Sequence, residues 1–248
     1  MLAGEITLAP HAETLLQRGV GRLVPEKSRR CLSQAPQGVA SLMDTLEVLA
    51  QTPLPTRHGL FQVIAFKTNG APEEHLAIFC GELKGAQKLL VRVHSECFTS
   101  EVLGSLKCDC REQLETALAV ISRRGRGMVV YLRQDGRGIG LVNKLKAYAL
   151  QAQGHDTVDA NRILGLPDDT RSYEAAAAIL THLGVESVSL LTNNPLKVEG
   201  LQAFGVNVID RQPVLIRANE HSAGYLEAKR LRMGHMLPTP TKCNTPGA

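Results

Sequence analysis

The feature that most constrains this chain is a group of three cysteines, Cys97, Cys108 and Cys110, in the stretch 92–143. No fourth cysteine in this stretch completes a four-thiolate structural zinc site. Three thiolates leave one position of a zinc ion open, and an open position is typical of catalytic zinc, which lowers the pKa of a bound water. The alternative is a set of ordinary buried thiols, and the spacing alone leaves that alternative open.

A glycine-rich segment, 133–140 (RQDGRGIG), follows a short apolar run and precedes an amphipathic one. In such a turn, glycines let backbone N–H groups approach an anion, the N-terminus of the following helix favours negative charge, and Arg133 or Arg137 can fork onto phosphate oxygens. The segment lacks the Gly-Lys-Ser/Thr ending of a Walker loop and the glycine spacing of a Rossmann fingerprint. The pattern fits a phosphate-binding turn and a plain glycine-rich turn equally well.

Two shorter polar segments each precede a predicted helix. Residues 192–195 (TNNP), with Lys197, follow a buried strand, and α/β sheets place ligands at the ends of such strands. An ordinary Asn/Pro helix cap explains the same residues. In 168–171 (DDTR), Asp169 is suited to cap a helix and Arg171 to face solvent, so this segment alone predicts no function.

The hydrophobic periodicity predicts an α/β fold. Strands are expected at 60–67, 76–81 and 88–94, joined by glycine-containing turns, as an N-terminal β-meander that leads directly into the cysteine group. Beyond it strands at 127–132, 187–192 and 206–210 alternate with helices at 112–123, 141–151, 173–183 and 195–204. This alternation predicts mixed β-sheets covered by helices.

We expect three regions along the chain. Residues 1–50 form an N-terminal extension that is partly flexible, with some helix in 41–50 and a basic cluster typical of a solvated face. Pro53 and Pro55 mark the boundary to a catalytic domain, 51–236. Residues 237–248 are rich in Pro and Thr and are expected to be a disordered tail.

Charge and cysteine usage narrow the class of protein only partly. The net charge of +4 fits an anionic small ligand as well as RNA. Six cysteines in 248 residues, three of them clustered, argue against a disulfide scaffold and for a reducing compartment. No signal peptide or run of membrane-spanning length is visible, so we expect a cytoplasmic protein.

Taken together, the motifs resemble the GTP cyclohydrolase II family. The matching segments, in unbroken order from about 54 to 213, are RVHSEC, KCDC, RQDGRGIGL, NKLKAYALQ, DTVDAN, the LG-x-x-x-D-x-R pattern and LLTNNPLKV. The resemblance implies a zinc- and magnesium-dependent enzyme that opens the imidazole ring of GTP. It would release formate and pyrophosphate and leave a diaminopyrimidine ribosylamino phosphate, in the first committed step of riboflavin biosynthesis.

The resemblance also implies partners and cofactors. These are GTP as substrate, one zinc ion per subunit, magnesium with the triphosphate, a homodimer, and no nucleic-acid or membrane partner. Because the chain shows no dihydroxybutanone-phosphate synthase half, it resembles the single-function form.

Family roles transfer to this chain residue by residue. The zinc ligands would be Cys97, Cys108 and Cys110, and the substrate contacts Arg92, Val93, His94, Ser95, Glu96, Gln113, Asp135, Gly136, Arg137, Thr157, Thr192 and Lys197. Tyr148 matches an essential tyrosine, Asp169 a proton acceptor and Arg171 a nucleophile toward the α-phosphorus. Because arginine has a pKa above about 12, a phosphate clamp is an equally good physical account of Arg171. Asp135 departs mildly from the family pattern, since some members have Glu there.

Two other functions stay open at this point. One is a family paralogue that stops at a formylamino product or serves a secondary-metabolite pathway. The other is a zinc- and nucleotide-binding regulator without catalysis, which a missing ligand or catalytic residue would favour. No such residue is missing from the motifs.

Overall fold

Seven strands form a single mixed sheet in the computed structural model, which describes residues 46–68, 72–155, 157–167, 169–216, 218–232 and 234–237. The strands are β1 (Leu46–Thr56), β2 (Gly59–Thr68), β3 (Glu74–Cys80), β4 (Leu89–Ser95), β5 (Gly127–Leu132), β6 (Val188–Leu191) and β7 (Val208–Gln212). Their order is β1-β2-β3-β5-β4-β6-β7. The pairs β1–β2, β2–β3 and β3–β5 are antiparallel, whereas β5, β4, β6 and β7 are parallel. The α/β fold with a mixed sheet is confirmed.

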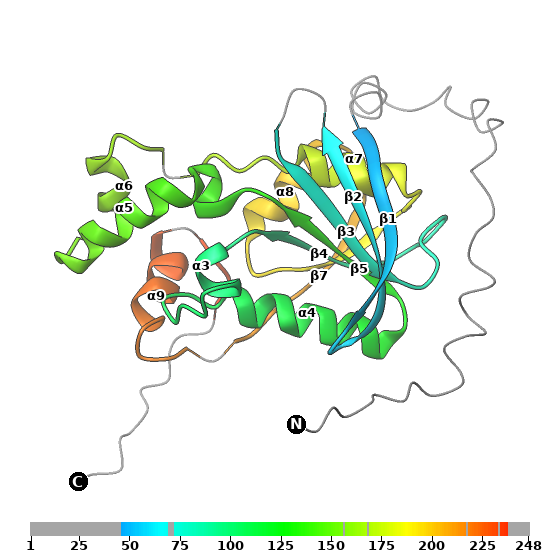
Figure 1. The fold of residues 1–248 in the computed structure, drawn as a ribbon, viewed down its shortest axis with the longest axis horizontal. Helices are drawn as coiled ribbons and strands as arrows, with labels where there is room; N and C mark the ends of the chain where they lie inside the picture. The colour runs from blue at the N-terminus through cyan, green and yellow to red at the C-terminus, as the bar shows by residue number, and fades with distance from the viewer. Residues whose placement is uncertain are drawn as a thin grey trace, which may run out of the picture. The chain divides into compact units, whose positions relative to one another are not determined.

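Helices cover both faces of this sheet (Figure 1). They are α3 (Phe98–Glu101), α4 (Cys110–Arg124), α5 (Gly140–Ala152), α6 (Thr157–Ile163), α7 (Glu174–His182), α8 (Pro195–Ala203) and α9 (Ala223–Arg232), with a 3-10 turn, η2, at Asp135–Gly138. On one face α7 and α8 pack on a core that includes Val91, Val93 and Leu190. On the other face α4 packs Ala117 and Ile121 against a second core.

The first expected helix is a strand instead. Residues 46–50 belong to β1, which pairs with β2 along its length, and 41–45 lie outside the described residues. Pro53 and Pro55 lie inside β1, opposite Gln62 and Leu60. An edge strand tolerates proline because one side of its backbone needs no partner, and cross-strand pairing here overrides local preference.

The expected meander is also only partly right. The strands β2 and β3 do pair, but β4 does not follow β3 in the sheet, because β5 lies between them. Residues 89–94 are all buried, so β4 is covered on both faces. Such an unbroken buried run belongs to an interior parallel strand rather than to a meander with one exposed face.

The remaining regional predictions are not tested by the fold. The described residues belong to one compact unit, Pro36–Ala248. The basic extension before residue 46 and the tail after residue 237 lie outside them. Within the described residues, no helix is both long enough and apolar enough to cross a membrane.

Candidate active site

Three parallel strands end side by side at the candidate site. In the register of β4 and β5, His94 lies opposite Tyr131 and Ser95 opposite Leu132, and β6 runs parallel on the other side of β4. The segments that follow these strands hold the first cysteine, the glycine-rich turn and the TNNP segment. Because polar residues after parallel strands meet at one edge, the three motifs line one pocket.

The three cysteine thiols converge at this edge. Their Sγ atoms all lie within 4.8 Å of one another, and those of Cys97 and Cys108 are 3.6 Å apart. Two sulfurs bound to one tetrahedral zinc ion at about 2.3 Å would be about 3.8 Å apart. The donor set therefore fits a zinc ion. Locally, Cys97 ends the run from β4 and caps α3, while Asp109 and Cys110 begin α4.

A lysine completes the charge balance of the thiols. Lys144 Nζ lies 3.0 Å from Cys97 Sγ and 2.7 Å from Asp135 Oδ1. Hydrogen bonds from the Cys108 and Cys110 thiols, together with the charge of Lys144, lower the pKa of Cys97. The pKa of Cys110 is raised, first by its contacts with Cys108 and Cys97 and then by burial. Three adjacent thiolates need more positive charge than one ammonium supplies, as a bound divalent cation would provide.

Glu101 fixes the backbone at the first cysteine. Its carboxylate accepts hydrogen bonds from Cys97 N–H at 2.9 Å and Tyr131 Oη–H at 2.7 Å, and it lies 2.8 Å from His94 Nε2. Burial lowers the pKa of His94 to about 4, so its imidazole is neutral near pH 7. His94 is thus held behind the pocket by this carboxylate and by stacking on the ring of Tyr131.

Arg92 starts a chain of buried hydrogen bonds across the base of the site. Its guanidinium donates to His94 Nδ1, to the carbonyl of Leu191 and to Gln113 Oε1. Gln113 Nε2 in turn donates to Asp109 Oδ2 at 2.5 Å. Arg92 therefore uses its donors to join β4, β6 and α4, which makes it a residue that positions the site.

The glycine-rich turn docks on the segment that holds Arg171. Gly136 and Arg137 have φ of 64° and 62°, and the carbonyl of Arg137 accepts from Thr170 N–H at 3.0 Å. A Cβ atom on Gly138 would lie 2.3 Å from Thr170 Oγ1. A side chain at this position would therefore clash with Thr170. The φ of +89° at Gly138 also disfavours any residue other than glycine. Within the same turn, Asp135 accepts from Phe98 N–H at 3.1 Å.

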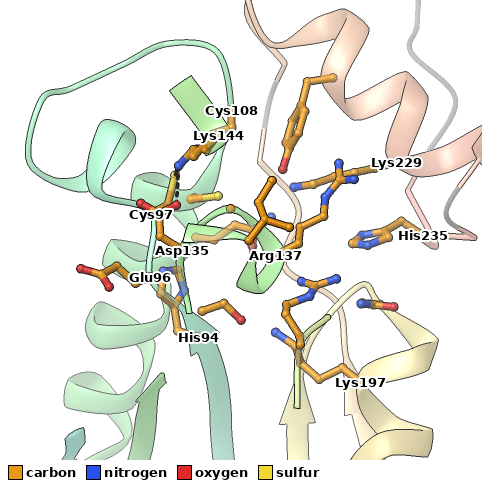
Figure 2. Close-up of a pocket in the computed structure, with 18 of the residues that line it drawn as sticks. His94, Glu96, Cys97, Cys108, Asp135, Arg137, Lys144, Lys197, Lys229 and His235 are labelled. Atoms are coloured by element: carbon orange, nitrogen blue, oxygen red, sulfur yellow. Dashed lines mark hydrogen bonds and ion pairs between the residues drawn. The ribbon is translucent and has the colours of Figure 1, made fainter. Parts of the chain in front are cut away.

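The opposite side of the pocket is cationic. Figure 2 shows Cys97, Cys108 and Lys144 on one side, and Lys197, Lys229 and His235 on the other. Lys197 is buried, and its Nζ donates to the carbonyl of Val93 at 2.7 Å.

Burial and neighbouring cations lower the pKa of Lys197 well below its usual value. A bound anion near Lys197 would favour its charged form, because the anion offsets the repulsion from the neighbouring cations.

Arg171 reaches this cationic side with a carboxylate partner. It forms an ion pair with Asp169, and three further hydrogen bonds between the two residues measure 2.9 to 3.1 Å. Although burial lowers the pKa of Arg171, the hydrogen bonds to Asp169 raise it above its usual value. Asp169 does not cap α7, whose first helical residue follows Tyr173.

Tyr148 lines the pocket from α5 and does not belong to the core. It shares one helix face with Lys144, Ala147 and Gln151, which also line the pocket, whereas Leu145 is 48% exposed. Burial raises the pKa of Tyr148 to about 12, so its hydroxyl is protonated and can donate a hydrogen bond. The Nζ of Lys107 lies 4.6 Å from its ring centroid.

Most of the predicted site residues come together in this pocket. Those lining it are Arg92, His94, Ser95, Glu96, Cys97, Cys108, Cys110, Gln113, Asp135, Gly136, Arg137, Tyr148, Arg171, Thr192 and Lys197. The side chain of Val93 belongs to the core, and Asp169 reaches the site through Arg171. Thr157 begins α6, and its side chain lies outside what the structure describes.

Sequence reasoning missed several lining residues, among them Lys144, Tyr225, Lys229 and His235. The helical spacing of Lys144, four residues before Tyr148, could have placed it on the pocket face. No sequence signal marked the other three.

A largely buried three-thiol group able to hold a metal ion lies beside a cationic pocket at the ends of parallel strands, which is an arrangement typical of α/β enzymes. The family model of GTP cyclohydrolase II matches residues 47–213, and the chain belongs to this family of hydrolases of riboflavin biosynthesis.

Relatives of two lengths match the chain. A GTP cyclohydrolase-2 of Actinobacillus succinogenes is 45% identical over 79% of this chain and 90% of its own. A GTP cyclohydrolase-2 of Acinetobacter baumannii is 48% identical over 77% of this chain and 96% of its own. The riboflavin biosynthesis protein RibBA of Salinispora arenicola is 50% identical over 77% of this chain, which spans only 46% of that relative.

Proposed function

We propose that this protein hydrolyses GTP by opening the imidazole ring of its guanine. The reaction would release formate and pyrophosphate and leave a diaminopyrimidine ribosylamino phosphate, the first step of riboflavin biosynthesis. The observation that carries this proposal is the division of one pocket into a thiolate side and a cationic side (Figure 2). A nucleoside triphosphate has a matching division into base and phosphates.

The base would point toward the thiols and the phosphates toward Arg171, Lys197 and Lys229. Cys97, Cys108 and Cys110 would hold a zinc ion, which supplies an activated water for attack on the imidazole carbon when it is bound. Lys144 keeps the Cys97 thiolate paired. Glu96 and Gln113, which line the pocket, have donors and acceptors suited to a guanine edge.

Among the described residues, the cysteine group is the one cluster of three or more His, Cys, Asp or Glu side chains able to hold a metal, and thiolates do not suit magnesium. We therefore propose that magnesium enters with the triphosphate, whose oxygens are its preferred ligands. The basic side chains on the cationic side of the pocket would neutralise the remaining phosphate charge: Arg137, Arg171, Lys197 and Lys229.

Arg171 would clamp the phosphates. Its contacts with Asp169 raise its pKa, so the guanidinium stays charged and is a poor nucleophile. A charged planar fork is well suited to phosphate oxygens. Asp169 would then orient the guanidinium of Arg171. These two roles differ from those that the family resemblance implies, a proton acceptor for Asp169 and a nucleophile for Arg171. Tyr148 would donate its hydroxyl hydrogen to a group on which charge develops during ring opening.

The direct test is incubation of the protein with GTP, zinc and magnesium, followed by mass analysis of the products. Equal amounts of formate and pyrophosphate with the deformylated pyrimidine are expected. A formylamino product without formate would instead identify the ring-opening paralogue. Tight GTP and zinc binding without turnover would identify a non-catalytic regulator.

The other sequence-based predictions stay predictions. These are the homodimer, the cytoplasmic location, the absence of nucleic-acid and membrane partners, and the division into an extension, a catalytic domain and a tail.

A further inference from the structure

The C-terminal segment contributes to the pocket although it lies beyond the residues that match the family. The match ends at residue 213, whereas Tyr225 and Lys229 of α9, together with His235 after it, line the pocket. Figure 2 shows Lys229 and His235 entering the pocket from the side opposite Cys97 and Cys108, and the Nζ of Lys229 reaches Asp109 beside the cysteine group. The wall of the site is thus built partly by a segment with no assigned role.

Three contacts fix this segment in place. Lys229 Nζ forms an ion pair with Asp109 Oδ1 at 3.0 Å, and both side chains are buried. The N–H of His235 donates to the carbonyl of Lys229 at 3.1 Å, and that of Met236 donates to the carbonyl of Asn193 at 2.9 Å. These backbone bonds hold the backbone of residue 235 beside the pocket, which the side chain of His235 lines.

The imidazole of His235 faces cations from three elements. These are Lys229 of α9, Lys197 of α8 and Arg171 before α7, and the carboxylate of Asp109 at the start of α4 acts in the opposite sense. Burial, followed by the three cations, lowers the pKa of His235 to about 3, so the imidazole is neutral near pH 7. Within the described part of the chain, no side-chain hydrogen bond to the imidazole is observed.

A polyphosphate changes this environment. Its charge offsets the three cations, and its oxygens accept hydrogen bonds from an imidazole N–H. We propose that α9 and residues 234–237 complete the phosphate end of the site, and that His235 binds the triphosphate of the substrate. The inference rests on the proposed function for the identity of that substrate, but a polyphosphate site is measurable without turnover.

The test compares His235→Ala and His235→Phe with the wild-type zinc-bound protein. The phenylalanine variant keeps a planar ring and removes both nitrogens, so it guards against a folding defect of the smaller side chain. Inorganic pyrophosphate, GTP and guanosine are the probes, measured by calorimetry. Pyrophosphate and GTP should bind at least about tenfold more weakly to both variants, because a hydrogen bond to a charged group is lost. Guanosine affinity and zinc content should not change.

His221→Ala is the matched control. His221 precedes α9, its side chain is 56% exposed, and it does not line the pocket. All three ligands should bind to this variant as they bind to the wild type. The KM for GTP should rise in the His235 variants and stay unchanged in the control.

Two results would overturn the inference. One is wild-type pyrophosphate affinity in a folded His235 variant. The other is an equal loss of guanosine and pyrophosphate binding, which would give His235 a structural role only. If the wild type binds pyrophosphate but releases no formate from GTP, the proposed reaction fails, and the His235 comparison is still decided by pyrophosphate.

Discussion

The thiols of Cys97, Cys108 and Cys110 lie too close together to act as independent core residues. Substitution of Cys110 by serine should therefore remove bound zinc and formate release together. We expect a loss of more than about a hundredfold in metal affinity, since changes even in outer-shell partners cost 10–100-fold. Zinc content by elemental analysis and formate release by a coupled assay would measure both effects.

Cys80 provides the control for this substitution. It lies outside the thiol group, and its Sγ approaches the carbonyl of Ile121 at 3.6 Å. Cys80→Ser should keep both zinc and activity, as should changes of Cys31 and Cys243, which lie outside the described residues. Full zinc content and formate release in Cys110→Ser would contradict the ligand assignment.

The hydroxyl of Tyr148 should matter for chemistry and little for stability. Its ring lies against Lys107 rather than in the core, so Tyr148→Phe should unfold at nearly the wild-type temperature. Formate release should fall by at least about a hundredfold, the usual cost of removing one donor to a developing charge. Near-normal formate release by the folded variant would show that the ring, and not the hydroxyl, is what the site uses.

At the residue scale, the motifs predicted the side chains to which we assign the distinctive chemistry. The cysteines follow from residue type and spacing, Tyr148 and Arg171 follow from the family resemblance, and all of them line one pocket. The buried charge partners did not follow. The spacing of Lys144 to Tyr148 places it on the pocket face of α5, but its contact with Cys97 depends on the packing of α5, which the sequence does not show.

At the scale of elements, local sequence patterns predicted the helices and strands of the second half. The form of β1 and the place of β4 in the sheet depend instead on pairing between strands. The amphipathic run at 112–123 became α4, and Gly125 ends it with φ of 67°. By contrast, β1 gains its extended form from ten residue pairs with β2 rather than from its own sequence. The place of β4 between β5 and β6 likewise depends on partners more than thirty residues away, which periodicity does not encode.

The close contact between two elements, the glycine-rich turn and the segment before α7, gives a prediction for Gly138. A methyl group in Gly138→Ala would meet Thr170 Oγ1 at 2.3 Å and would strain a positive φ. The turn must then shift away from Arg171. We expect the free energy of unfolding to fall by roughly 1–3 kcal/mol, and the KM for GTP to rise.

Gly140→Ala separates strain from contact. Gly140 also has a positive φ, +83°, but no atom lies within 4 Å of the Cβ that alanine would add. It should show the backbone strain alone, with a smaller loss of stability and little change in KM. Equal effects of the two substitutions on KM would argue against the contact with Thr170 as the feature that matters.

At the scale of the whole molecule, the site depends on residues far apart in sequence. Lys229 and Asp109 are separated by 120 positions, yet their side chains form one buried pair next to the three-cysteine group. From this pair a series of side-chain hydrogen bonds runs through Gln113 to Arg92, so α9, α4 and β4 are joined by one hydrogen-bonded network. No sequence pattern predicted it, because a lysine in an amphipathic helix usually reaches solvent.

Removal of Lys229 should therefore destabilise the whole site. Lys229→Met leaves the carboxylate of Asp109 buried without its cation, and breaking a buried pair in this way costs about 3–5 kcal/mol. Urea unfolding of the zinc-bound protein should show this loss, and zinc affinity should fall with it because Asp109 lies between two ligands. By comparison, Arg230→Ala removes a solvent-screened pair with Glu227 on the same helix and should lower the stability much less than Lys229→Met does.

A second substitution identifies the cause of the Lys229 effect. Asp109→Asn removes the charge that Lys229→Met leaves unpaired, while the amide oxygen can still accept from Gln113. The double variant should therefore be more stable than Lys229→Met alone, although it contains one more change. If the double variant is no more stable, the loss comes from the packing of the Lys229 stem against Tyr225, whose ring centroid lies 4.4 Å from Nζ, and not from the buried charge.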